Sequence, residues 1–138
     1  MKTTKILTAA FAALLLAACQ SGGGGGEMKE VAAQESGGVR VVLLSETGDL
    51  SQGDNRFHIA FRSAGTGQPV EVGAVSISSS MSMPGMPPMV APIELEPAGE
   101  PGQYALKGTF GMSGAWQFEV RWSGAAGQGS ASFSANVR

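Results

Sequence analysis

A strict alternation of apolar and polar side chains over residues 115–122 limits the fold of this chain most strongly. A period of two is typical of a strand with one buried face. The apolar positions are Trp116, Phe118, Val120 and Trp122. Six further β-like runs, separated by turn-forming residues, cover 39–45, 56–62, 70–80, 90–96, 103–110 and 130–137. The spacing predicts an all-β fold, an immunoglobulin-like antiparallel β-sandwich of about seven strands, with a small barrel as the alternative.

The first 18 residues have the pattern of an export signal. Lys2 and Lys5 precede an apolar run that is too short to span a bilayer as an ordinary helix. Small residues then lead into Cys19, the only cysteine, in the arrangement of a bacterial lipobox. We expect cleavage before Cys19 and a lipid anchor on it in the bacterial cell envelope, and in a Gram-negative cell Gln20 favours the outer membrane, facing the periplasm. The alternative is an ordinary cleavage site beside a chance cysteine.

Composition divides the rest of the chain into a tether and one domain. Residues 19–38 begin with the lipidated Cys19 and contain five consecutive glycines, so we expect a flexible tether with at most an unstable helical turn over 27–34. Residues 39–138 form the β domain. Loss of Lys2 and Lys5 leaves seven basic and eleven acidic residues without a basic run, which argues against nucleic-acid binding.

The segment MSMPGMPPM, residues 81–89, holds four methionines within nine positions. Its prolines fix φ and remove N–H donors, so it cannot continue a central strand or a helix. Thioether sulfur is soft and uncharged and suits Cu(I). The sequence predicts a loop or bent strand end whose sulfurs form a Cu(I) site. A partner-binding rim and plain apolar packing remain alternatives. The predicted ligands here are Met81, Met83, Met86 and, as a spare, Met89.

Two further residues bear on this site. Met112 lies in a short loop before Trp116, and loops at one end of a sandwich meet in space, so Met112 is predicted to complete the ligand set. Trp116 would shield the metal or offer its ring face to it, although its alternation with Phe118 points it inward. His58, the only histidine, lies opposite Phe57 and Ile59 in the pattern and is expected to face outward.

The ordered motifs from Gly67 to Trp122 resemble the YtkA-like domain family, with kinship to FixH-like envelope domains. They comprise Met81-x-Met83-Pro84-x-Met86, Gly102-x-Tyr104 and Met112-x-Gly114-x-Trp116. The resemblance implies an exported immunoglobulin-like β-sandwich, often a lipoprotein or attached to metal-efflux components, with copper or heavy-metal handling as the usual suggestion. Many relatives continue after the third methionine with Gly, His or Met, whereas Pro87-Pro88-Met89 follows here, so the site would be nearly all sulfur, which favours Cu(I) over Cu(II) or zinc.

These features favour a binding protein over an enzyme, since no nucleophile motif or carboxylate pair is present. We expect an envelope lipoprotein that binds Cu(I) for buffering, delivery or resistance. The alternative is a metal-free module whose Met/Pro loop docks on an envelope efflux or oxidase-assembly complex.

Overall fold

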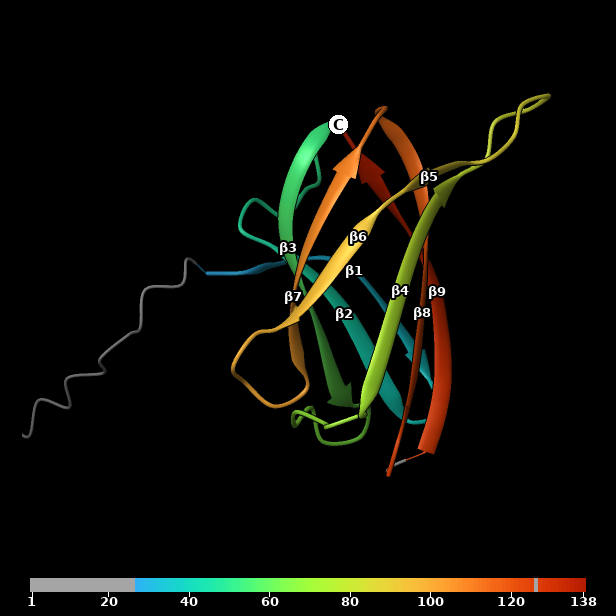
Figure 1. The fold of residues 1–138 in the computed structure, drawn as a ribbon. Coiled ribbons are helices and arrows are strands. Elements are labelled where there is room, and N and C mark those ends of the chain that lie inside the picture. Colours follow the sequence, from blue (N-terminus) through green and yellow to red (C-terminus); the bar gives the residue numbers. More distant parts are fainter. Residues whose placement is uncertain (1–26, 126) are drawn as a thin grey trace, which may run out of the picture.

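The computed structural model describes residues 27–125 and 127–138. These residues form nine strands and no helix (Figure 1). The strands are β1 (Lys29–Ser36), β2 (Val39–Ser45), β3 (Gly53–Ser63), β4 (Ala74–Met81), β5 (Met89–Ala91), β6 (Ile93–Pro97), β7 (Gln103–Phe110), β8 (Gly114–Gly124) and β9 (Gly127–Val137). Within this part of the chain no helix is long and apolar enough to cross a membrane. The predicted signal peptide, Cys19 and the glycine run lie outside the described residues.

The strands build two antiparallel sheets that pack face to face. One sheet has the order β1-β2-β3-β7-β6 and the other the order β5-β4-β8-β9 (Figure 1). Every pairing between neighbouring strands is antiparallel. This confirms the predicted all-β sandwich of antiparallel sheets, and the two separate sheets replace the barrel that was the alternative. Each of the seven predicted runs overlaps at least one of these strands.

The structure differs from the sequence prediction at its N-terminal edge. Residues 29–36 were expected to belong to the tether, but they form β1, which pairs along the whole of β2. The ladder shifts register between Glu30 and Ala32, as at a β-bulge, so the period of two is interrupted. An edge strand gains its order from its partner, which is why its own sequence carries a weak signal.

The run predicted over 90–96 is divided by Pro92 between β5 and β6. Proline has no N–H to donate to a ladder. β5 pairs with β4 in the four-stranded sheet, whereas β6 pairs with β7 in the five-stranded sheet. The chain therefore passes from one sheet to the other within one residue.

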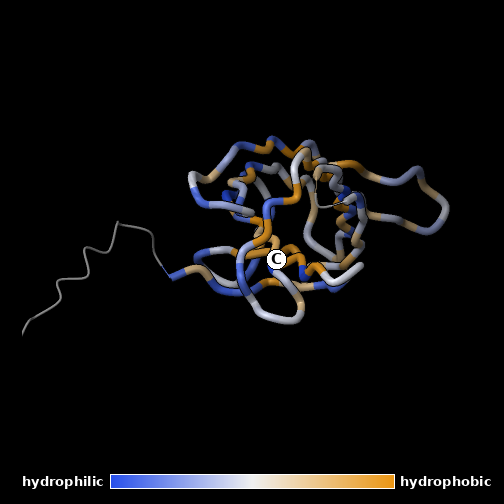
Figure 2. Tube along the Cα trace, turned by 90° about the horizontal axis from the view of Figure 1, so that it is seen from below, coloured by the Kyte–Doolittle hydropathy of each residue, from blue (hydrophilic) through white to orange (hydrophobic). Residues whose placement is uncertain are grey.

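The core lies between the sheets and is rich in aromatic rings. Trp116, Phe118 and Val120 of β8 are fully buried, as the alternation predicts, and Trp122 is 7% exposed. The Phe57 ring meets the Phe118 ring edge-on with centroids 6.3 Å apart. Figure 2 shows apolar and polar residues alternating along the strands, while the β4–β5 hairpin projects beyond the sandwich.

One end of the sandwich is closed by the segment between β3 and β4. The Phe61 N–H donates to the Gly102 carbonyl at 2.7 Å, and the Val70 N–H donates to the Phe61 carbonyl at 2.9 Å. A Cβ atom on Gly102 would lie 2.4 Å from the Val70 carbonyl oxygen, and φ is +69°, so only glycine fits. The Tyr104 hydroxyl donates to the Gly73 carbonyl at 3.0 Å. We call this the tyrosine end.

Candidate functional site

The predicted methionine segment forms the β4–β5 hairpin at the opposite end of the sandwich. Met81, the last residue of β4, is paired with Met89, the first residue of β5. Residues 82–88 make the connecting loop, and the Met86 N–H donates to the Met83 carbonyl at 3.2 Å. Gly85 has φ of +75°, a conformation that glycine adopts without strain. The predicted interruption of the strand is therefore a projecting hairpin loop.

The hairpin distributes its methionines between the core and the solvent. Residues paired directly across a ladder point to the same face, so Met81 and Met89 both face the other sheet. Met81 is 7% exposed, whereas Met83 and Met89 are half-buried and pack against the core. Met86, near the tip of the hairpin, is 62% exposed. The four side chains thus form a series from the interior to the tip rather than one buried pocket.

The β7–β8 loop, residues 111–113, lies against the inner part of this series. A Cβ atom placed on Gly111 would stand 3.5 Å from the Met89 sulfur, and one placed on Gly114 would stand 2.6 Å from the Met81 methyl carbon. Met112 lies between these two glycines and is 41% exposed. The structure therefore brings Met81 and Met89 to the loop that carries Met112, and leaves Met86 on the projecting tip. We call Met81, Met89 and the β7–β8 loop the methionine end.

Trp116 lies beneath the loop. Its side chain is fully buried, and its ring meets the Phe110 ring at 5.2 Å between centroids. Its indole N–H donates to the Met112 carbonyl at 3.0 Å. Its observed contacts are thus to the core and to the backbone of the Met112 loop. Shielding of a metal by this ring stays a prediction.

A second side chain, Gln52, also holds the loop, and no sequence pattern selects this residue. The Gln52 side-chain amide donates to the Gly111 carbonyl at 2.9 Å. The Gln52 N–H donates in turn to the Arg138 carbonyl at 2.7 Å, and the Arg138 N–H donates to the Leu50 carbonyl at 2.9 Å. Gln52 is distant from the methionines in sequence, so only the fold places it here.

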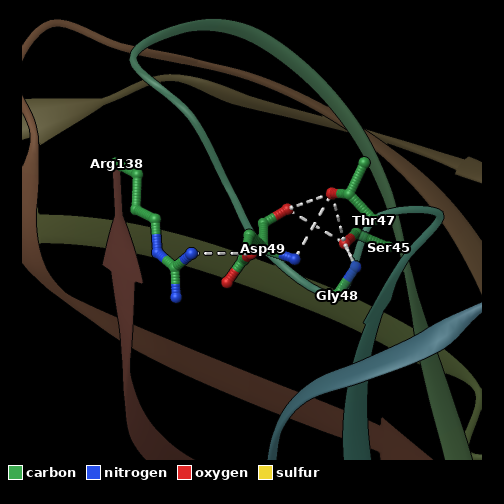
Figure 3. Close-up of polar contacts among 5 residues, drawn as sticks. All are labelled: Ser45, Thr47, Gly48, Asp49 and Arg138. Carbon is green, nitrogen blue, oxygen red and sulfur yellow. Dashed lines mark hydrogen bonds and ion pairs between the residues drawn. The ribbon is translucent and has the colours of Figure 1, made fainter.

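The turn between β2 and β3 is itself strongly hydrogen-bonded. The Ser45 hydroxyl donates to the Asp49 carbonyl at 2.9 Å and accepts from the Gly48 N–H at 2.9 Å. The Thr47 hydroxyl donates to the same carbonyl at 3.0 Å. An ion pair at 3.2 Å joins the Asp49 carboxylate to the Arg138 guanidinium (Figure 3). Gln52 thus extends from an ordered turn.

Harder metal ligands are absent from the methionine end. Among the described residues, no three His, Cys, Asp or Glu side chains lie close enough to hold a metal ion. His58 faces the outer side of the five-stranded sheet between Leu44 and Ala105, half-buried, as the alternation predicted for its face. No ionisable side chain occurs between Glu71 and Glu94 or between Lys107 and Glu119. The donors that these two segments offer are thioethers, while the charged residues Asp54 and Arg138 approach the β7–β8 loop through their hydrogen bonds to Thr109 and Gln52.

Fold and site together define a small two-sheet β-sandwich domain with a methionine-bearing hairpin at one end. The chain belongs to the YtkA-like family, whose model matches residues 24–121. This confirms the resemblance drawn from the three motifs. No curated protein sequence matches the chain significantly.

Two solved structures are similar to this chain. A DUF4426 family protein (PA0388) from Pseudomonas aeruginosa is 17% identical with a TM-score of 0.53, over 76% of this chain and 94% of that one. PcoC, a methionine-rich copper resistance protein from Escherichia coli, is 14% identical with a TM-score of 0.46, over 65% of this chain and 88% of that one. The likeness to the DUF4426 protein supports the fold alone.

Proposed function

We propose that this chain is an envelope lipoprotein that binds Cu(I) through methionine sulfur and buffers or delivers it. The observation that carries the proposal is the convergence of Met81 and Met89 on the loop that bears Met112. Thioethers bind a soft ion without first losing a proton, and an uncharged donor set favours a soft monovalent ion over harder divalent cations. Binding and transfer, rather than catalysis, suit a site with one kind of donor.

The exposure series suggests how the ligands divide. Met81 and Met89 form the inner set, Met83 packs against the core beside them, and Met112 stands at the surface of the set, 41% exposed. Met86 on the exposed tip is placed to capture the ion or pass it on. Three thioethers suffice for a Cu(I) site of low coordination number, so the tip is free to exchange.

Anchoring and location form part of the same proposal. The basic start, the apolar run and Cys19 support export and lipid attachment, and in a Gram-negative cell Gln20 supports the outer membrane facing the periplasm. The glycine run would separate the domain from the membrane surface. The hairpin would then be accessible to a second envelope protein, for example from efflux or oxidase assembly.

Anaerobic Cu(I) titration of the lipid-free domain, against a chromophoric Cu(I) chelator, tests the proposal. We expect about one Cu(I) per chain and loss of binding when Met81, Met89 and Met112 are changed together to leucine, which keeps the apolar volume but removes sulfur. Met28→Leu is the matched control, because Met28 packs on a separate cluster with Val42 and Leu44. Retention of copper by the triple variant, or no binding by the wild-type domain, would contradict the proposal.

A metal-free docking role has its own supporting observation. Within the described residues, the large apolar side chains that are exposed are Met86, Val90 and Met112, at 62%, 67% and 41%. Two come from the β4–β5 hairpin and the third from the loop beside it. If docking is the function, leucine at 86 and 112 preserves it, while Val90→Ser weakens binding to the envelope partner. A Cu(I) site shows the opposite pattern, since Val90 offers no donor atom.

A further inference from the structure

Met112 lies in a loop that is short, partly exposed and yet held by side chains on both sides. Trp116 holds the Met112 carbonyl at 3.0 Å from within the core. Gln52 holds the neighbouring Gly111 carbonyl at 2.9 Å from the outside. A loop of three residues between two strands has few backbone groups, so two such bonds fix most of its freedom.

The buried indole makes the inner bond specific. Trp116 is fully buried, and a buried N–H without a hydrogen-bond partner costs free energy. The indole N–H therefore needs an acceptor at this position. The Met112 carbonyl is that acceptor. The Trp116 ring also packs against the ring of Phe110, the residue just before the loop, so both contacts hold the indole in place. The direction of the Met112 backbone is thus set by the core.

Gly114 contributes the third element. Its φ of +135° is one that side chains disfavour, and a Cβ atom there would stand 2.6 Å from the Met81 methyl carbon. The missing side chain leaves the space in which the end of Met81 lies. Gly111 differs, since a Cβ atom there would stand at an ordinary 3.5 Å from the Met89 sulfur.

We infer that Trp116, Gln52 and Gly114 are positioning residues that place Met112 beside Met81 and Met89 before any ion arrives. The functional part of this inference rests on the proposed Cu(I) site. Its geometric part concerns the metal-free protein. It gives the element Met112-x-Gly114-x-Trp116 a physical meaning: donor, space and hydrogen-bond anchor within five residues. Neither the Trp116 nor the Gln52 side chain needs to touch the ion, and Gly114 acts by having no side chain.

Trp116→Phe is the central test, with Trp122→Phe as its matched control. Both changes replace indole by phenyl in β8, but Trp122 contacts Phe61 towards the tyrosine end rather than the Met112 loop. Outer residues that orient ligands typically change metal affinity 10- to 100-fold when mutated, so we expect a loss of about tenfold or more for Trp116→Phe and little change for Trp122→Phe. Thermal unfolding of both variants corrects for any general loss of stability.

Two further variants test the outer bond and the space. Gln52→Ala should weaken Cu(I) binding in the same direction as Trp116→Phe, since it frees the Gly111 carbonyl. Gly114→Ala should displace the end of Met81 and weaken binding, whereas Gly111→Ala should leave it nearly unchanged. Equal losses for the two glycine variants, or for the two tryptophan variants, would overturn the inference.

The geometry is also tested without copper. Amide hydrogen exchange across residues 111–115 of the metal-free protein should rise in Trp116→Phe and in Gln52→Ala, and not in Trp122→Phe. Unchanged exchange in both loop variants would overturn the positioning role. Absence of Cu(I) binding by a wild-type domain with a protected loop would instead contradict the proposed function and leave the positioning role intact.

Discussion

The two ends of this sandwich are built by opposite means. At the tyrosine end, backbone meets backbone at distances that leave no room for a side chain at Gly102, and a Cβ atom on Gly73 would lie 2.5 Å from the Ser123 carbonyl oxygen. At the methionine end, flexible apolar side chains fill the space under a projecting hairpin. Methionine adapts to irregular gaps, whereas closely packed backbone does not. One end is suited to hold the sheets together, and the other to change its contacts.

The largest expected effect is on the tyrosine end. Gly102→Val should destabilise the domain by at least about 3 kcal/mol, because it combines a disfavoured φ with a clash against the Val70 carbonyl. Gly85→Ala has a similar φ but meets nothing within 4 Å, and should cost about 1–2 kcal/mol. Urea unfolding of both variants measures the difference. Equal losses would mean that backbone contact does not distinguish the two ends.

A smaller effect separates the methionines from one another. Met81→Ala should lower the free energy of unfolding by about 2–3 kcal/mol, because it opens a cavity among buried side chains. Met86→Ala should change it by less than about 0.5 kcal/mol, because that side chain is largely solvated. Chemical denaturation of the metal-free domain measures the free energy of unfolding of both variants. A large cost at Met86 would show that the hairpin tip packs more closely than its exposure indicates.

The smallest expected effect depends on pH. Burial, and then the nearby Glu71 carboxylate, raise the pKa of Tyr104 above its ordinary value of 10.0. The folded state therefore holds the phenol proton more tightly than the unfolded state, and its contribution to stability is present below pH 10 and lost above it. Tyr104→Phe should reduce this alkaline loss. The effect is modest, since the hydroxyl is partly in contact with solvent. An identical alkaline profile for wild type and variant would contradict the assignment.

The sequence predicted the strands whose alternation is strong and missed those defined by their neighbours. β7 begins and ends where the pattern over 103–110 does, and the predicted core face of β8 is buried. β1 was missed because its order comes from pairing with β2. Pro92 can be seen in the sequence as a break in the run over 90–96. The change of sheet at this residue depends on which strands pair, and the sequence does not show that.

The candidate site was predicted in composition but not in arrangement. Spacing gathers Met81, Met83, Met86 and Met89 into one segment, and the expectation that loops at one end of a sandwich meet adds Met112. The sequence alone does not show that Met81 pairs with Met89 across the hairpin. This pairing places both side chains on the same face of the sheet. The contact of Gln52 with the β7–β8 loop depends on the β2–β3 turn and on β9, and no local pattern encodes it.

The passage of the chain through Pro92 limits how the hairpin can open. β5 has three residues and ends at Ala91, and Ile93 already belongs to the other sheet. Peeling β5 from β4 would pull on β6 and on the ladder that β6 shares with β7. Any cargo would therefore leave by rotation of side chains and bending of the tip, at low cost, while both strand ladders stay closed.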